Sequence, residues 1–186
     1  VTFTKGPNPP ATANALEDDD TIHYDFPAGF VFPFYGKEYT DCWVNSDGNI
    51  TFEAGYEYQA RHPASFLNNM PRIAGLYTDL AKNPGDNKIA IETFADHITF
   101  HYVNLPQWSS VAPVGSNTVD ISIYLDGSIE FQFGSCTMSQ SQADDDDVEW
   151  KGVVGIHPGA YDTYPMVDLS AQPNPIPIPS NAPVYQ

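Results

Sequence analysis

Basic residues are scarce in this sequence. Seven Lys and Arg stand against 24 Asp and Glu, so the formal net charge is −17. This balance argues against nucleic acid as a partner, because phosphate binding needs basic patches. The excess of acid fits solubility in a salty or extracellular medium. It also fits binding of calcium, a hard cation that prefers clustered oxygen ligands.

Long apolar runs are missing as well. No run approaches the length of a transmembrane helix, so we expect no insertion into a membrane. The 17 Pro and 13 Gly indicate many turns and few long helices. The first residues show no signal-peptide pattern, as expected of a mature secreted chain or an excised domain.

Cysteine is limited to two residues, Cys42 and Cys136, whose spacing fits no zinc motif. Cys42 is expected on a strand that leads into one hairpin, and Cys136 just past a strand that leaves another. If these strands neighbour each other across the core, the two thiols form a disulfide.

Alternation of apolar and polar residues dominates the middle of the chain. In TVDISIYL, residues 118–125, the apolar residues on one face are Val119, Ile121, Ile123 and Leu125, and the alternation resumes after Asp126-Gly127. A second hairpin is expected from residues 88–103, and only PASFLNNM, residues 63–70, suggests a short helix. Roughly nine or ten short strands predict an all-β fold, an antiparallel β-sandwich or jelly-roll.

Both ends of the chain differ from this pattern. We expect an extended N-terminal arm over residues 1–20, a β-sandwich domain over 21–169 and a proline-rich tail over 170–186. VTFT, at the start of the arm, can pair with its own sheet or add to the edge of a neighbouring copy. Pairing with a neighbour would build a filament or array, whereas the alternative is that both arms are interdomain linkers.

The pair Asp-Gly occurs twice between short apolar runs, at Asp47-Gly48 and at Asp126-Gly127. Asp-Gly is typical of type I′ hairpin turns, in which both central residues have positive φ. We therefore expect Asp47 and Asp126 to be turn residues and not ligands or catalysts.

Several segments resemble, in order, an extracellular β-domain common in bacterial secreted and surface proteins and distantly similar to the nidogen-type (NIDO) domain. They are FPFYGKEYTDCWVNSDGNITFEAG, FLNNMPRIAGLYTDLAKNPGDNKIAIET, HITFHYVNLPQWSS, NTVDISIYLDGSIEFQFGS and VVGIHPG, within residues 24–160. The resemblance implies an extracellular β-sandwich-like module without established catalytic residues. The paired cysteines and the acidic run at 144–147 depart from that pattern.

Acidic residues beside predicted strands are the candidate calcium ligands, although none forms the EF-hand pattern. The Asp79 position recurs in the resembling family, which fits either a ligand or a hydrogen bond that anchors a loop. For the acidic runs, the alternative is a solvated loop. The candidates are Asp18, Asp19, Asp20, Asp79, Asp86, Asp144, Asp145, Asp146 and Asp147.

Other surface sites are weaker. Tyr56, Tyr58 and Trp108 fall in predicted loops, where flat rings could stack on sugars or simply pack over a sheet edge. Asn49-Ile50-Thr51 is an N-glycosylation sequon at a hairpin end, which we expect to be exposed. His97 and His101 share one side of a predicted strand, but the sequence identifies no further zinc ligands.

No catalytic pattern stands out: the sequence has no GxSxG elbow, and chance pairs of carboxylates carry no weight among 24 acidic residues. We predict a non-catalytic extracellular or cell-surface module, calcium-stabilised, with a structural, adhesive or self-assembly role. Its expected partners are other copies of itself or neighbouring extracellular domains. The alternative is a carbohydrate-binding accessory domain of a secreted enzyme, and a hydrolase is the weakest hypothesis.

Overall fold

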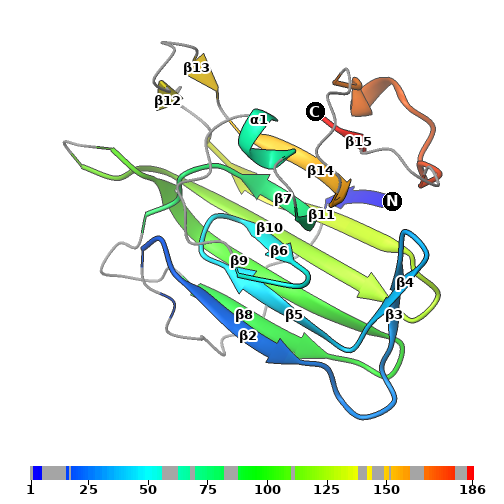
Figure 1. The fold of residues 1–186 in the computed structure, drawn as a ribbon. Coiled ribbons are helices and arrows are strands. Elements are labelled where there is room, and N and C mark those ends of the chain that lie inside the picture. The colour runs from blue at the N-terminus through cyan, green and yellow to red at the C-terminus, as the bar shows by residue number, and fades with distance from the viewer. Residues whose placement is uncertain are drawn as a thin grey trace.

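The computed structural model (Figure 1) describes most of the chain. The described residues are 2–5, 16, 18–55, 63–67, 70–81, 88–109, 112–137, 142–143, 149–150, 152–159, 166–178 and 184–186. Among them, no helix is long and apolar enough to cross a membrane.

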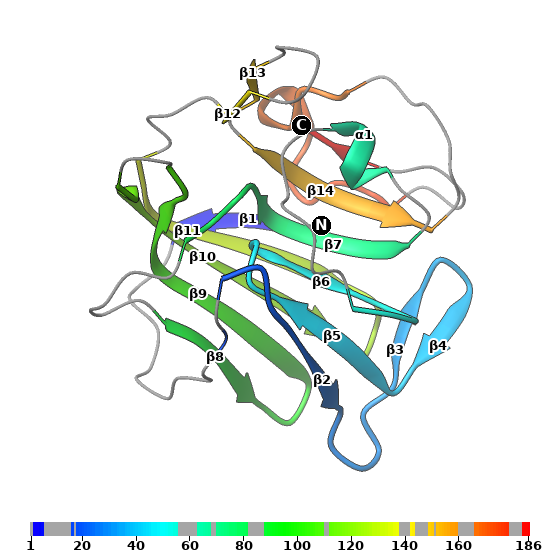
Figure 2. The ribbon, with the colours of Figure 1, turned by 60° about the vertical axis from the view of Figure 1, so that its left-hand side comes forward.

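Two β-sheets form the body of the molecule and lie as two layers (Figures 1 and 2). The first has five strands, in the order β1 (Thr2–Lys5), β11 (Ile129–Cys136), β10 (Val114–Tyr124), β9 (His97–Gln107) and β8 (Lys88–Thr93). The second has six, in the order β15 (Val184–Tyr185), β14 (Val153–Pro158), β7 (Pro71–Tyr77), β6 (Asn49–Thr51), β5 (Asp41–Asn45) and β2 (Thr21–Asp25).

Smaller elements surround these sheets. Two short ribbons pair β3 (Phe32–Phe34) with β4 (Lys37–Tyr39), and β12 (Gln142–Ala143) with β13 (Glu149–Trp150). The helix α1 (Pro63–Phe66) and the 3₁₀ turn η1 (Leu169–Ala171) are each a single turn. The all-β antiparallel sandwich is confirmed, and its fifteen named strands exceed the expected nine or ten because several are only two to four residues long.

The core lies between the two sheets, where the period-two pattern places the apolar side chains. Val119, Ile121 and Ile123 of β10 are completely buried, and so are Ile50 and Ile73 of the facing sheet. Leu125, expected on the same face, is 41% exposed because it lies in the turn that follows β10. The layers approach closely at Gly75 of β7, because a Cβ there would lie 2.9 Å from Val119 Cγ2 and 3.0 Å from Ile121 Cγ1. A side chain at this position would push the sheets apart.

The described parts of both chain ends belong to the sheets. β1 runs parallel to β11, with Thr2 opposite Glu130 and Lys5 opposite Phe133. Residues 2–5 thus take the first of the two expected alternatives, pairing within their own chain. At the other end, β15 pairs with the edge strand β14.

The type I′ prediction for the two Asp-Gly turns is wrong. Gly48 and Gly127 have positive φ, at 67° and 83°, but neither aspartate does. Asn45 pairs with Asn49, and Tyr124 N donates to Ser128 O, so each loop contains three residues. In a three-residue loop only the last position needs the left-handed conformation, and glycine occupies it in both.

The predicted disulfide is also wrong, because both cysteines are free. Cys42 lies on β5 of the six-stranded sheet, with its side chain completely buried in the core. Cys136 ends β11 of the other sheet, is exposed, and its Sγ donates to Thr118 O at 3.4 Å. The two strands belong to different layers, and the two side chains have opposite environments.

These environments predict unequal reactivity. Burial, followed by the charge of Asp41, raises the pKa of the Cys42 thiol well above its ordinary value, and burial also raises that of Cys136. Because the thiolate is the reactive form, we expect a maleimide to label Cys136 slowly in the native chain and Cys42 only after unfolding. Mass spectrometry, with Cys136→Ser as control, checks this. A non-reduced chain that takes up no label in denaturant would contradict it.

Candidate metal centre

The first Asp-Gly loop, residues 46–48, packs against the end of β7. Gly48 O accepts hydrogen bonds from Gly75 N and Leu76 N, both at 3.1 Å. A Cβ on Gly48 would overlap Leu76 O, so this loop and β7 touch backbone to backbone. Glycine is required here both for the positive φ and for this close approach.

The turn before β2 packs against the same loop, residues 46–48. Asp20 N donates to Ser46 Oγ at 3.0 Å, and Ser46 N donates to Asp20 O at 2.9 Å. Asp19, the residue before this pair, has φ of 50°, a left-handed conformation that aspartate tolerates better than most residues. The reciprocal bonds therefore fix Asp19 beside the loop that carries Asp47.

The segment after β7 completes the site and links it to the other sheet. Asp79 O accepts a hydrogen bond from Trp108 N at 2.9 Å, and Ala81 N donates to Pro106 O at 2.9 Å. Leu80 forms a bridge with Gln107, the last residue of β9. Residues 79–81 thus leave the six-stranded sheet and pair with the end of the five-stranded one.

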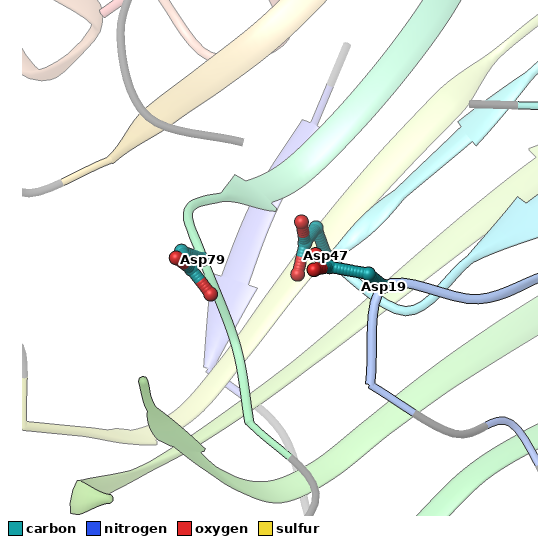
Figure 3. A group of neighbouring side chains, drawn as sticks. All are labelled: Asp19, Asp47 and Asp79. Atoms are coloured by element: carbon teal, nitrogen blue, oxygen red, sulfur yellow. The ribbon is translucent and has the colours of Figure 1, made fainter. Parts of the chain in front are cut away.

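Three carboxylates meet at this junction: those of Asp19, Asp47 and Asp79 (Figure 3). One oxygen atom from each lies within 4.8 Å of one from each of the others. Asp47 and Asp79 are only 3% and 2% exposed, and Asp19 lies nearest the surface. Asp47 Oδ1 also accepts a hydrogen bond from Leu80 N at 3.0 Å, which holds its carboxylate against the Asp79 segment.

Electrostatic repulsion acts between these three carboxylates. At 4.8 Å and an effective dielectric constant of about 20, each pair of ionised carboxylates repels by ~3 kcal/mol. The repulsion is relieved either by a proton or by a cation. The spacing suits a calcium ion, because two oxygens bound to one calcium at about 2.3–2.6 Å lie at most about 5 Å apart.

A network of buried hydrogen bonds holds the loop that carries Asp47. Asn49 Nδ2 donates to Asp47 O at 3.0 Å, Asn45 Nδ2 donates to Asn49 Oδ1 at 3.0 Å, and Tyr102 Oη donates to Asn49 O at 2.8 Å. The expected exposure of the Asn49 sequon is therefore wrong: Asn49 is completely buried, and its amide is used inside the fold. A glycan has no room at this position in the folded domain.

The structure brings together only part of the predicted ligand set. Asp19 and Asp79 are joined, whereas Asp18 is exposed in the same turn as Asp19, and the Asp20 side chain accepts a hydrogen bond from Thr21 N at 2.8 Å. The remaining predicted ligands lie outside the described residues: Asp86, Asp144, Asp145, Asp146 and Asp147.

Asp47 was expected to be a turn residue only, but its carboxylate also makes a hydrogen bond outside its own loop. The comparison with Asp126 shows why the sequence misleads. Asp126 is exposed, and its Oδ1 accepts a hydrogen bond from Ser128 N within its own loop, which lowers its pKa. Asp47 sits in the same kind of loop but reaches Leu80, 33 residues away. Only the packing of β7 against the first loop distinguishes the two aspartates.

Neither the predicted sugar site nor the predicted histidine site contributes a side chain to this cluster. Trp108 is 38% exposed and is bonded to Asp79 by its backbone N–H, while Tyr56 and Tyr58 lie outside the described residues. His97 stacks between Phe94 and Tyr124, and His101 pairs with Asp120 at 2.8 Å. Among the described residues, Asp19, Asp47 and Asp79 form the one acidic, histidine or cysteine group close enough to hold a metal.

Comparison with known proteins gives a family and no individual relative. A family model described as NIDO related matches residues 1–181. No curated protein matches the chain, and no solved structure does.

The two Asp-Gly loops provide a matched pair of glycine substitutions. Gly48→Ala combines positive φ with overlap on Leu76 O, whereas in Gly127→Ala the new Cβ would lie 3.1 Å from Pro33 O. We expect Gly127→Ala to lower the free energy of unfolding by ~1–2 kcal/mol, the strain of the left-handed conformation, and Gly48→Ala to lower it by ~2 kcal/mol more. Urea denaturation measures both, and equal losses would show that the loop and β7 are not in close contact.

Proposed function

The chain belongs to the NIDO-related family, and from this premise we propose that it is a non-catalytic extracellular module held rigid by one calcium ion. The proposed ligands are Asp19, Asp47 and Asp79. The observation that carries the proposal is the convergence of these three carboxylates, two of them buried, at the junction of the two sheets.

The family supports the extracellular and non-catalytic parts of the proposal. NIDO-related domains are typical of extracellular proteins and are not enzymes. Extracellular calcium modules bind the ion at about 0.1–1 mM, so a site with three carboxylates and further oxygen ligands from water or backbone is sufficient.

The positions of the ligands suggest what the ion would do. Asp19 precedes β2, Asp47 joins β5 to β6, and Asp79 leads from β7 toward β9. One ion would therefore tie together three segments that are distant in sequence. We propose that calcium stiffens this end of the sandwich, so that the module keeps its shape in a structural or adhesive role between neighbouring domains or copies.

Calcium should raise the melting temperature of this chain. At a calcium concentration 100 times Kd the stabilisation is about 2.7 kcal/mol, or roughly 5–10 °C for a domain of this size. Magnesium should stabilise less, because it tolerates irregular oxygen cages poorly. Differential scanning calorimetry in chelator, magnesium and calcium measures the effect.

Asp47→Asn and Asp126→Asn are the matched variants, since each amide can keep the hydrogen bond its loop needs. We expect Asp126→Asn to retain the full calcium response. Asp47→Asn should lose most of it, yet melt no lower than the parent in chelator, because the substitution removes one repelling charge. A parent chain with the same melting curve in chelator and calcium, or an unchanged response in Asp47→Asn, would contradict the proposal.

A self-assembly role requires β1 to leave its own sheet and pair with β11 of a neighbouring copy. The supporting observations are that β1 is an edge strand, pairs parallel in an otherwise antiparallel sheet, and is held by four residues. Calcium would favour such exchange by reducing the repulsion between copies of charge −17.

Deletion of residues 1–10 tests this role. If strands exchange, the intact chain should sediment as larger species in calcium, and the shortened chain should not form them. The shortened chain should also bind a synthetic peptide of residues 1–10, but not one carrying Phe3→Pro, because proline removes a ladder hydrogen bond. An intact chain that is monomeric at every calcium and salt concentration would rule out assembly.

A further inference from the structure

A cavity of about 580 Å³ opens at the side of the sandwich away from β2 and β8. Leu76 of β7, Val154 of β14 and Phe133 of β11 form its apolar floor, so both sheets contribute. The C-terminal segment covers it, with Leu169 and Ile176 turned inward. This volume lies within the range of small-molecule sites, about 300–1,000 Å³.

The cover over this cavity is anchored by hydrogen bonds. Val154 and Gln186 exchange two backbone hydrogen bonds of 2.8 Å, and Val167 N donates to Tyr185 O at 2.9 Å. Leu169 N donates to Gln186 Oε1 at 2.7 Å. A pocket whose wall is already fixed in this way needs little ordering when a ligand binds.

The described residues of the lining are all uncharged, although the chain carries 24 acidic side chains. Its polar groups among the described residues are the hydroxyl of Ser170 and the amides of Gln172, Asn174 and Gln186. An ionised ligand would lose its hydration here without gaining a countercharge. The lining therefore favours a neutral ligand with an apolar body and a few hydroxyl or carbonyl groups.

The pairing of the edge strands argues against a peptide as the ligand. An extended peptide binds by adding a strand to an open sheet edge. On this side of the molecule, β1 already pairs with β11 and β15 already pairs with β14. The edges of β11 and β14, the two strands that line the cavity and would otherwise be open, are thus taken by the chain itself, and a concave apolar space is left beside them.

We propose that this cavity is a binding site for an uncharged, mainly apolar small molecule, which enters between the C-terminal segment and the strands β7, β11 and β14. Asp19, Asp47 and Asp79 are not among the described residues that line the cavity, so its test does not depend on the proposed calcium function. Its apolar ligand would be shielded from water by side chains of both sheets and of the C-terminal segment.

Fluorescence titration with Nile red, a neutral apolar dye, tests the site directly. We expect a saturable rise in emission with the parent chain, and weaker binding of the anionic dye anilinonaphthalene sulfonate. Val154→Phe fills the cavity from its floor and should weaken Nile red binding by about tenfold or more. Val103→Phe makes the same change at a half-buried position of β9 outside the cavity and should leave binding unchanged.

Gln172→Phe provides a second blocking variant on an exposed position of the cover, so its folding is not at risk. Circular dichroism checks each variant, and Gln172→Phe decides the outcome if Val154→Phe does not fold. Absence of saturable binding overturns the proposal, as does equal affinity of the parent and the folded blocking variants. Tighter binding of the anionic dye overturns the uncharged class of ligand.

Discussion

Three carboxylates converge where the two sheets are connected, and the proposed function depends on the repulsion between them. Asp19, Asp47 and Asp79 come within 4.8 Å of one another, and two of them are almost fully removed from water. A fold that needed no countercharge would not gain stability from such a cluster. Backbone contacts nevertheless fix the cluster in place. Reciprocal hydrogen bonds join the Asp20 and Ser46 segments, and Gly48 permits close contact with β7.

The cluster also stands where the two layers are connected. Residues 79–81 pass from β7 to the end of β9, and Asp47 holds them through Leu80 N. The charges of the cluster therefore affect how firmly the two sheets are held together, and not only the position of one loop. In the extracellular module that we propose, an ion at this junction would link calcium concentration to rigidity.

The strands could be predicted from the sequence, because period-two alternation in 118–133 and in 88–103 identifies the apolar side chains that face the core. The alternation does not show that polar residues on the other face, such as Thr99, Asp120 and Ser122, are buried as well. The site could be predicted only in part. Asp79 was identified because it follows a buried strand, but Asp47 and Asp126 look alike in sequence and differ only in what packs against their loops. The sequence likewise does not show that Cys42 and Cys136 lie on different sheets or that Asn49 is buried, because layer and burial are properties of the tertiary fold.

A crystal structure of the chain grown in calcium, with anomalous diffraction data, tests the central claim most directly. We expect an anomalous peak between Asp19, Asp47 and Asp79, with carboxylate oxygens at about 2.3–2.6 Å from the ion. Crystals at saturating calcium that show no ion there, with two carboxyl groups sharing a proton instead, would contradict it.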